Sequence, residues 1–294
     1  MKFHEDVYIE HPPGLKVPKN QVCKLEKALY GLRSSPRDWY DCFDEYIKSL
    51  GFKRSIHDCC LYFKDLKINP IFILLYVDDI LLISAKLNKI CNLKESLKDR
   101  FQMKDLGEVK KYLGIEIKRD RKEKVIALNQ SEYIYSVAEK FNVLDSKGFK
   151  TPMEQNLKLY PAEQTSNQTT YRSLIGALLY VAMNTRPDIA HSVNYLSRFQ
   201  NSCNDTHHKY ALRVLKYLLE TIDLNLIFYG KIDKNQILSC CVDADWAGDP
   251  VDRKSTTGFV IKLYGNPIMW KSRKQPCVTK SSTEAEYVAL SNAT

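Results

Sequence analysis

The chain has 294 residues and a net charge of +9, and 44% of its residues are hydrophobic. This length indicates about two domains, each large enough to bury a core. No apolar run approaches the roughly 18 residues of a membrane span, and the N-terminus lacks the apolar segment of a secretory signal. We therefore expect a cytoplasmic or nuclear protein with no membrane partner. The basic charge is compatible with a polyanionic partner, and equally with a surface that only aids solubility.

In the first half of the chain, hydrophobic periodicity and breaker residues predict both helices and strands. Residues 34–52 predict a helix that a serine can cap and that Gly51 ends. Two buried strands are predicted at 71–76 and 80–85, a helix at 87–101, a strand pair at 110–120 and 124–130, and a helix capped by Ser131 at 131–143.

The second half begins with a polar, unpatterned stretch at 151–170, the best candidate for a linker. Helices are predicted at 171–185, 186–200 and 207–222, with Pro187 at a helix start. Four strands are then predicted at 224–230, 237–245, 256–265 and 267–275, followed by a helix at 282–293.

Asp78 and Asp79 join the two strands predicted at 71–76 and 80–85. Aspartate is common in hairpins because it tolerates turn conformations, so the pair is compatible with an ordinary turn. The alternative is that the turn presents two carboxylates to divalent cations, as phosphoryl transfer with two metal ions requires. The turn residues by themselves leave both interpretations open.

Four more aspartates lie close together in the chain: Asp243, Asp245, Asp249 and Asp252. A calcium-binding loop would need a glutamate eleven positions after Asp243, where the chain has Lys254, so that kind of site is excluded. Further on, Glu286 fits either a helix capping box that begins at Thr283 or a carboxylate that binds metal.

Seven blocks are distinctive when they are taken in order. They are VYIEHPPG (7–14), CKLEKALYGLRSSPRDWY (23–40), YVDD (76–79), MKDLGEVKKYLGIEI (103–117), YRSLIGALLYVAMNTRPDI (171–189), DADWAGDPVDRKSTTGF (243–259) and SSTEAEYVAL (281–290). Together they resemble the Pol polyproteins of copia-type LTR retrotransposons. The resemblance covers nearly the whole chain, and the order of the blocks makes it specific.

The resemblance implies an α+β protein with three parts. Residues 1–150 would hold partial fingers, palm and thumb of a reverse transcriptase, residues 151–232 a linker and helical connection, and residues 233–294 the N-terminal part of a ribonuclease H-like α/β domain. The implied partners are an RNA template, a DNA primer, an RNA–DNA hybrid and the rest of the Pol polyprotein.

For the polymerase, the resemblance implies that Asp78 and Asp79 are catalytic and bind Mg²⁺ or Mn²⁺, with two ions at the site. Tyr76 would lie beside the nascent strand. Tyr112 and Gly114 resemble the hairpin that grips the primer end. The alternative for these two residues is a strand aromatic and a strand glycine that contact no nucleic acid.

For ribonuclease H, the resemblance implies that Asp243 and Glu286 are catalytic metal ligands, again with two ions. Asp245 has no matching role, and we interpret it as a solvated acid at a strand end. Three basic residues would bind phosphates or else form a charged solvent face: Lys271, Arg273 and Lys274.

Two blocks of the family are absent from the 294 residues, one with the first palm aspartate and one with a later ribonuclease H aspartate. Each site then keeps two of its expected acids, so we expect a Pol fragment, truncated at both ends, whose two activities are impaired or lost. The alternative is a non-catalytic remnant that binds nucleic acid. A host protein that merely shares the palm fold is disfavoured by the order of the blocks.

Overall fold

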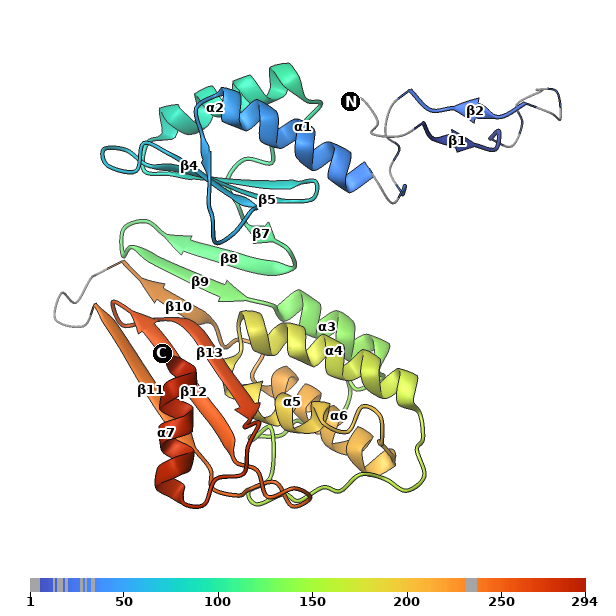
Figure 1. The fold of residues 1–294 in the computed structure, drawn as a ribbon, viewed down its shortest axis with the longest axis vertical. Helices are drawn as coiled ribbons and strands as arrows, with labels where there is room; N and C mark the ends of the chain where they lie inside the picture. The colour runs from blue at the N-terminus through green and yellow to red at the C-terminus, as the bar shows by residue number, and fades with distance from the viewer. Residues whose placement is uncertain are drawn as a thin grey trace. The chain divides into compact units, whose positions relative to one another are not determined.

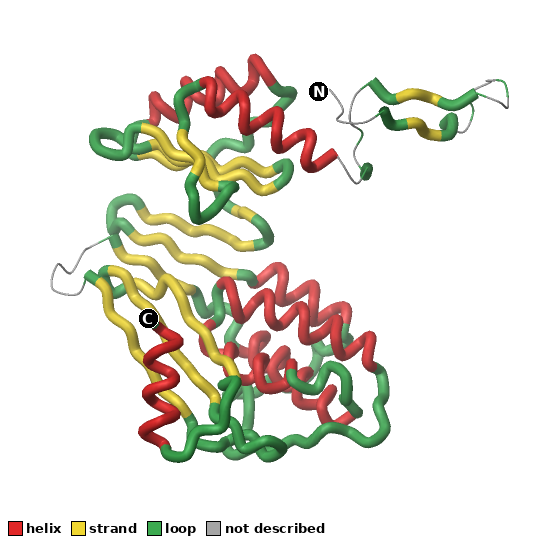
Figure 2. The backbone as a smooth tube through the Cα atoms, in the orientation of Figure 1, coloured by secondary structure: helices red, strands yellow, loops and turns green. Residues whose placement is uncertain are grey.

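The computed structural model describes residues 6–12, 14, 18, 21–26, 29, 31–32, 35–230 and 237–294. The packing divides the chain into two compact units, Met1–Gly107 (unit 1) and Glu108–Thr294 (unit 2). Both units contain helices and sheets, labelled in Figure 1 and coloured by type in Figure 2. This mixture confirms the α+β class.

Unit 1 is built on an antiparallel sheet with the strand order β3-β4-β5-β6. The strands are β3 (Lys53–Arg54), β4 (Leu61–Lys64), β5 (Ile71–Tyr76) and β6 (Asp79–Ser84). Two helices, α1 (Ser35–Ser49) and α2 (Leu87–Arg100), lie over one face of this sheet (Figure 1). A short separate pair joins β1 (Tyr8–Ile9) to β2 (Cys23–Lys24).

Side-chain alternation along β5 determines which face of the sheet the helices cover. Ile71, Ile73 and Leu75 are buried against Phe43 and Ile47 of α1, which lie one helical turn apart. Burying each such side chain contributes roughly 1.5–3 kcal/mol. The other face of β5 consequently has no part in this core.

The helix predicted at 34–52 is α1, and Gly51 ends it with a φ of +85°, the left-handed conformation common just after a helix. Ser34, a candidate cap, lies outside the described residues. The two strands and the helix predicted next correspond to β5, β6 and α2.

Unit 2 combines two sheets with a group of helices. One sheet has the order β10-β9-β8-β7 and the other β11-β12-β13. The strands are β7 (Lys111–Tyr112), β8 (Ile115–Asp120), β9 (Val125–Asn129), β10 (Leu226–Tyr229), β11 (Leu238–Ala244), β12 (Thr256–Leu263) and β13 (Asn266–Lys274). The helices are α3 (Ser131–Lys140), α4 (Gln168–Asn184), the 3₁₀ turn η1 (Pro187–Ile189), α5 (Ala190–Ser197), α6 (Asp205–Glu220) and α7 (Ser282–Ala293).

The main core of unit 2 lies among α3, α4, α5 and α6. On α4 the buried positions Tyr171, Leu174, Ile175 and Leu178 follow the spacing of one helix face. Pro187 begins η1, so the prediction of a helix start there is confirmed. In the ranges that the structure describes, no helix combines the length and the apolar character that crossing a bilayer requires.

The predicted cap of α3 is wrong. The residue before the helix is Gln130, and Ser131 is the first helical residue. The Ser131 hydroxyl instead donates a hydrogen bond of 2.7 Å to the carboxylate of Glu116 on β8. The Ser131 hydroxyl, which the local sequence predicted to cap the helix, therefore bonds to a carboxylate on another strand.

The four strands predicted after residue 223 divide between two sheets. β10 pairs with β9, and β11, β12 and β13 form their own sheet. The amide of Asn129, at the end of β9, donates to the carbonyls of Ile222 and Leu224, just before β10. These bonds align the chain after α6 with β9. The three functional divisions at 1–150, 151–232 and 233–294 remain predictions, and the last boundary falls outside the described residues.

An ion pair with a buried arginine holds η1, and further hydrogen bonds connect both residues to α6. Arg186 is only 3% exposed, and its guanidinium donates to both oxygens of Asp188 at 2.9 and 2.7 Å. Arg186 also donates to the carbonyl of Thr221 at the end of α6, and the Tyr217 hydroxyl donates to Asp188. The turn between α4 and α5 is thereby fixed against α6.

Replacing Asp188 with asparagine should lower the free energy of unfolding by roughly 3 kcal/mol, because it leaves the buried Arg186 without its counter-charge. Urea denaturation measures the difference. Glu154→Gln is the matched control: Arg213 pairs with a Glu154 side chain that is 53% exposed, so its loss should stay below about 1 kcal/mol. Equal losses would contradict the importance of the burial of Arg186.

Candidate functional site

The turn with Asp78 and Asp79 is fixed by the pairing of β5 with β6. Tyr76 pairs with Asp79, so only Val77 and Asp78 connect the two strands. Val77 has a φ of +51°. A β-branched residue rarely adopts this conformation, which costs of order 1–3 kcal/mol unless the surroundings hold it. The turn is therefore tight and strained at the residue before the two acids.

Asp79 lies on the face of the sheet opposite α1 and α2. Residues that pair directly across two strands share a face, so Asp79 shares that face with Tyr76. Leu75, the neighbour of Tyr76, points into the helix-covered core. Tyr76 is 56% exposed, so the structure places an accessible aromatic ring next to an accessible carboxylate.

Both carboxylates of the turn are exposed, and within the described part of the chain neither has an ion-pair partner. Oxygen ligands of this type suit Mg²⁺ and Mn²⁺. The described residues contain a single cluster of three candidate metal-ligand atoms within 4.8 Å of one another, formed by Asp58, Cys59 and Cys60. No third described acid joins Asp78 and Asp79.

The structure adds one residue that the sequence analysis did not assign to this site. Trp39 lies on α1 and packs against the core of unit 1. Its indole Nε1 also donates a hydrogen bond of 2.7 Å to the carbonyl of Val77. Periodicity identifies the buried face of a helix, but it gives no sign of this bond.

Tyr112 and Gly114 lie at the hairpin between β7 and β8 in unit 2. Tyr112 pairs with Ile115, which leaves Leu113 and Gly114 as a two-residue turn in which both φ values are positive, at +50° and +73°. Such a turn favours glycine. The Tyr180 hydroxyl of α4 donates to the Leu113 carbonyl. The same hydroxyl would lie 3.5 Å from a Cβ added at Gly114, which is ordinary van der Waals contact, so the positive φ is the reason for glycine here.

Asp243 and Glu286 lie on elements that pack together. Asp243 is on β11, and α7 packs against β11 and β12 through the buried Ala285 and Ala289. Both acidic side chains are exposed. Neither has an ion-pair partner among the residues that the structure describes.

The capping alternative for Glu286 is wrong, because another pair of residues caps α7. The helix is capped by Ser281, whose hydroxyl accepts from the Glu284 backbone at 3.1 Å, and the Glu284 carboxylate accepts from the Lys280 backbone at 2.7 Å. Glu286 is two residues further along the helix. Its carboxylate therefore has no role in the helix start.

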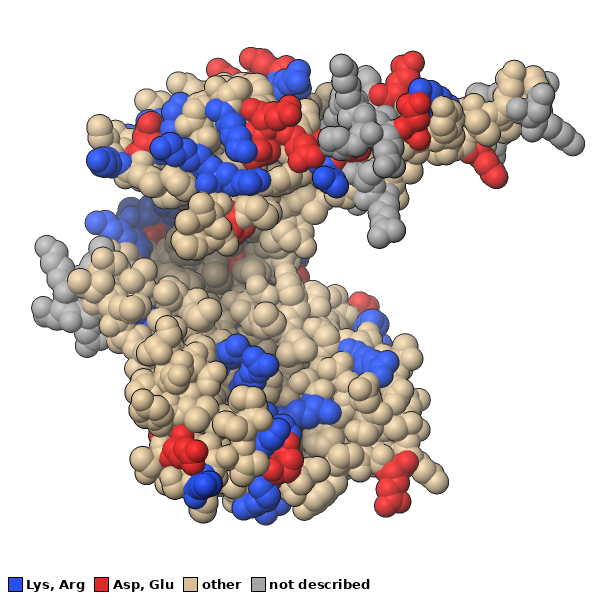
Figure 3. Space-filling model, in the orientation of Figure 1, with Lys and Arg blue, Asp and Glu red and all other residues tan. Residues whose placement is uncertain are grey.

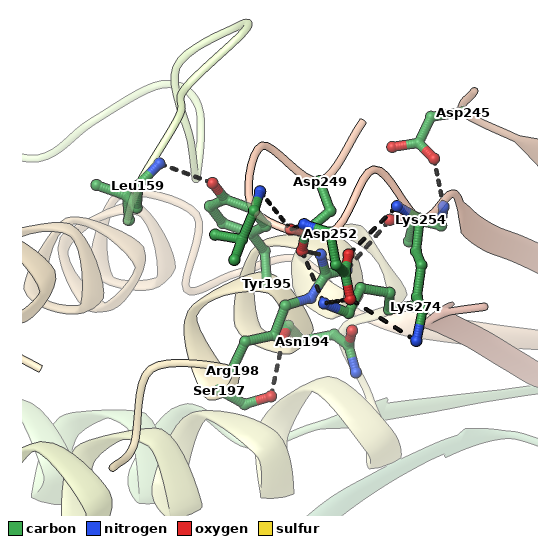
Figure 4. A network of polar contacts seen from close by, with 12 residues as sticks. Leu159, Asn194, Tyr195, Ser197, Arg198, Asp245, Asp249, Asp252, Lys254 and Lys274 are labelled. Carbon is green, nitrogen blue, oxygen red and sulfur yellow. Dashed lines mark hydrogen bonds and ion pairs between the residues drawn. The ribbon is translucent and has the colours of Figure 1, made fainter. Parts of the chain in front are cut away.

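The aspartates after β11 form an ordered network, drawn in Figure 4. Asp249 is 5% exposed, and its carboxylate accepts from Arg198 and Lys274, both at 3.0 Å. Burial by itself would raise the pKa of Asp249, but Lys274 and the backbone N–H groups of Val251 and Asp252 outweigh burial and hold that pKa at about 2. This loop is thus held by a structural carboxylate.

Asp245 also has a local role. It is exposed, and its carboxylate accepts from the backbone N–H of Thr256 at the start of β12. The interpretation of Asp245 as a strand-end acid therefore gains a specific partner.

The three basic residues of β13 fall into two groups. Lys271 and Arg273 are exposed and alternate residues of a strand, so they share a face. Lys274 points the other way and donates to Asp249 and to Asp252 at 3.0 and 2.9 Å. Any phosphate contact by β13 would thus involve Lys271 and Arg273 more readily than Lys274.

On the side of unit 1 seen in Figure 3, Lys and Arg are interspersed with Asp and Glu.

Comparison with known proteins assigns the chain to a class. A family model described as reverse transcriptase (RNA-dependent DNA polymerase) matches residues 1–155, more than half of the chain. A transposon Ty5-1 protein of Saccharomyces cerevisiae is 34% identical, and the alignment covers 98% of this chain and 94% of that relative. The chain belongs to the reverse transcriptase family.

Its relatives narrow this class to copia-type transposons, as the sequence blocks predicted. The chain is 40% identical to the retrovirus-related Pol polyprotein from transposon TNT 1-94 of Nicotiana tabacum, and 38% identical to that from transposon RE1 of Arabidopsis thaliana. Each alignment covers 98% of this chain and 22% or 20% of the relative. The chain thus spans about a fifth of the length of these polyproteins. No solved structure matches it.

Asp249→Asn should destabilise the protein by roughly 2–4 kcal/mol at neutral pH, because Arg198 and Lys274 lose a buried counter-charge. The folded pKa of about 2 lies below the value of about 3.9 for unfolded aspartate. The stabilisation is therefore complete above pH 4–5 and is lost as the pH falls toward 2. Urea denaturation should show a difference between wild type and variant about 1 kcal/mol smaller at pH 3 than at pH 6. A difference that does not change with pH would contradict this assignment.

Glu284→Ala should lower stability by about 0.5–1 kcal/mol, since it removes the carboxylate that accepts from the Lys280 backbone N–H just before α7. Glu286→Ala, on the same helix, should stay within about 0.5 kcal/mol of wild type, as expected for an exposed residue away from a cap. Thermal unfolding followed by circular dichroism compares the two. A larger loss for Glu286→Ala would restore the capping interpretation.

Proposed function

We propose that this chain carries parts of the polymerase and ribonuclease H of a copia-type Pol polyprotein. The observation that supports this most directly is the turn of Asp78 and Asp79: two exposed carboxylates on a strained two-residue hairpin, in a chain of the reverse transcriptase family. An ordinary hairpin gains nothing from a strained valine before two adjacent acids. A site that must present both carboxylates in one orientation does.

In this proposal, residues 1–150 supply partial fingers, palm and thumb, residues 151–232 a linker and helical connection, and residues 233–294 the first part of the ribonuclease H-like domain. The sheet of β3 to β6 with α1 and α2 would form the palm. The partners would be an RNA template, a DNA primer, an RNA–DNA hybrid and the remainder of the polyprotein, in the cytoplasm or nucleus.

The donor chemistry of both acidic pairs suits Mg²⁺ or Mn²⁺, two ions at each site. Asp78 and Asp79 would hold them in the polymerase, and Asp243 and Glu286 in the ribonuclease H. When bound, such ions supply charge stabilisation for in-line phosphoryl transfer. Because Tyr76 is exposed beside Asp79, its ring is available to pack against the nascent strand.

Other residues of the chain would orient the nucleic acid. Tyr112 and Gly114 lie at a hairpin that is held from behind by Tyr180, so this hairpin is a rigid element for a primer end. Lys271 and Arg273 are exposed on one face of β13 and would bind phosphates without regard to sequence. Lys274 would contribute less, because Asp249 and Asp252 already pair with it.

We further propose that these 294 residues, expressed by themselves, have little or no activity. Two acids of each expected set are matched within them. Removing even an outer partner of a metal ligand typically costs 10–100-fold in metal affinity or activity, and the absence of a direct ligand should cost more. The second candidate function, nucleic-acid binding without chemistry, is supported by the exposed pair Lys271 and Arg273.

The test uses the purified 294-residue chain with a DNA primer on an RNA template, and with an RNA–DNA hybrid of arbitrary sequence. Primer extension with Mg²⁺ or Mn²⁺ should not exceed that of Asp78→Asn/Asp79→Asn. Binding to the hybrid should weaken steeply with salt, and Lys271→Ala/Arg273→Ala should reduce the slope of log K against log salt by about 1–2, whereas Lys274→Ala should change it by less than about 1.

Extension above the double aspartate variant would show that the remaining acids suffice, which contradicts the loss of activity. Failure to bind the hybrid at low salt, together with no effect of the aspartate substitutions on Mn²⁺ binding, would contradict the proposed function as a whole.

A further inference from the structure

The strained turn of Val77 and Asp78 needs something outside itself to hold its backbone. Val77 is 50% exposed and adopts a φ of +51°, so its side chain has too little contact to impose the conformation. The hydrogen bonds of β5 and β6 end at the pair of Tyr76 and Asp79. The ladder fixes the ends of the turn and leaves the orientation of its central peptide group open.

That peptide group has a partner in α1. The indole Nε1 of Trp39 donates to the Val77 carbonyl at 2.7 Å, across 38 positions of sequence. This distance is at the short end of the range for N–H···O hydrogen bonds. A tryptophan N–H in a packed environment usually has such a partner.

Trp39 is itself firmly held. Its ring packs on Phe43 of the same helix, with centroids 5.8 Å apart, and meets the edge of Phe101 at 5.0 Å. Phe43 is fully buried in the core of unit 1. The donor that reaches the turn is thus anchored in the buried core of this unit.

Holding the Val77 carbonyl orients Asp78. The carbonyl of Val77 and the N–H of Asp78 belong to one planar peptide group. Once the oxygen is fixed by Trp39, the plane that leads into the Cα of Asp78 is fixed as well. The indole N–H of Trp39 donates to the backbone and not to a carboxylate, so its influence on the two acids passes through the backbone.

We propose that Trp39 is a positioning residue for the two acids: its indole N–H holds the strained Val77 peptide in the orientation that lets Asp78 and Asp79 face the same cation. This inference rests on the proposed function, because it assigns a purpose to the orientation of the two carboxylates. The inference adds that cation binding by Asp78 and Asp79 requires one N–H donor on α1.

The test is Mn²⁺ binding to the 294-residue chain, followed by electron paramagnetic resonance of the free ion. Trp39→Phe keeps an aromatic ring in the core and removes the donor. It should weaken the Mn²⁺ affinity that depends on Asp78 and Asp79 by about tenfold, the lower end of the range for partners that orient metal ligands.

Tyr46→Phe is the matched control. Tyr46 is also on α1, packs against Phe101 with centroids 5.4 Å apart, and donates to a backbone carbonyl, that of Ser96, at 2.7 Å. Its loss should shift the urea midpoint by an amount similar to that of Trp39→Phe, while Mn²⁺ affinity changes less than twofold. Equal effects of both variants on Mn²⁺ affinity would reduce Trp39 to a residue of the core and overturn the proposal.

A second variant, Val77→Gly, tests whether Trp39 acts by holding the strained conformation of Val77. Glycine adopts positive φ without penalty, so Val77→Gly should make the turn less dependent on its anchor. Adding Trp39→Phe to Val77→Gly should then weaken Mn²⁺ binding less than threefold. A full tenfold loss in this background would contradict the link through strain.

The two proposals fail in different ways. If Asp78→Asn/Asp79→Asn leaves Mn²⁺ binding unchanged, the metal role of the turn is wrong. If it abolishes binding while Trp39→Phe has no effect, only the role of Trp39 is wrong. In either case the carbonyl ¹³C resonance of Val77 should shift in Trp39→Phe and not in Tyr46→Phe; an unshifted resonance would show that the bond itself is absent.

Discussion

A connection of only two residues between β5 and β6 is the constraint on which the candidate polymerase site depends. Because Tyr76 pairs with Asp79, Val77 must take a backbone conformation that valine avoids. The same pairing puts Asp79 and Tyr76 together on the face that α1 and α2 leave uncovered. The burial of alternate residues of β5 decides that face, so the hydrophobic core of unit 1 and the direction of the acids have one cause.

In unit 2 some acids form ion pairs that hold elements together, and others are exposed. Asp188 and Asp249 are paired with buried or half-buried cations and hold elements together. Asp243 and Glu286, which the resemblance selected, are exposed on β11 and α7. The acids that hold elements together and the two acids that the resemblance selected are thus separate sets.

The sequence predicted most elements, because their patterns are local: α7 begins at Ser282 as the spacing indicated, and β5 and β6 follow their apolar runs. What the sequence did not predict depends on groups far away in the chain. The Ser131 hydroxyl donates to Glu116 and does not cap α3, Lys274 donates to Asp249, and β10 pairs with β9, about a hundred residues away. For the candidate site, motifs selected the acids, but the bond from Trp39 to Val77 depends on the packing of α1 against the sheet. No local pattern encodes it.

The pairing of β10 with β9 has a consequence for how the chain can be divided. It closes residues 130–225 into a loop whose two ends lie on adjacent strands, about 4.8 Å apart. The helices of this loop and the hairpin before it therefore fold as one body, although the proposed functional boundary at residue 150 runs between them. A fragment that stopped at that boundary would leave one edge of β9 without its neighbour, and an unpaired edge is a template for aggregation. The proposed functional boundary at residue 150 therefore does not coincide with a boundary between folding units.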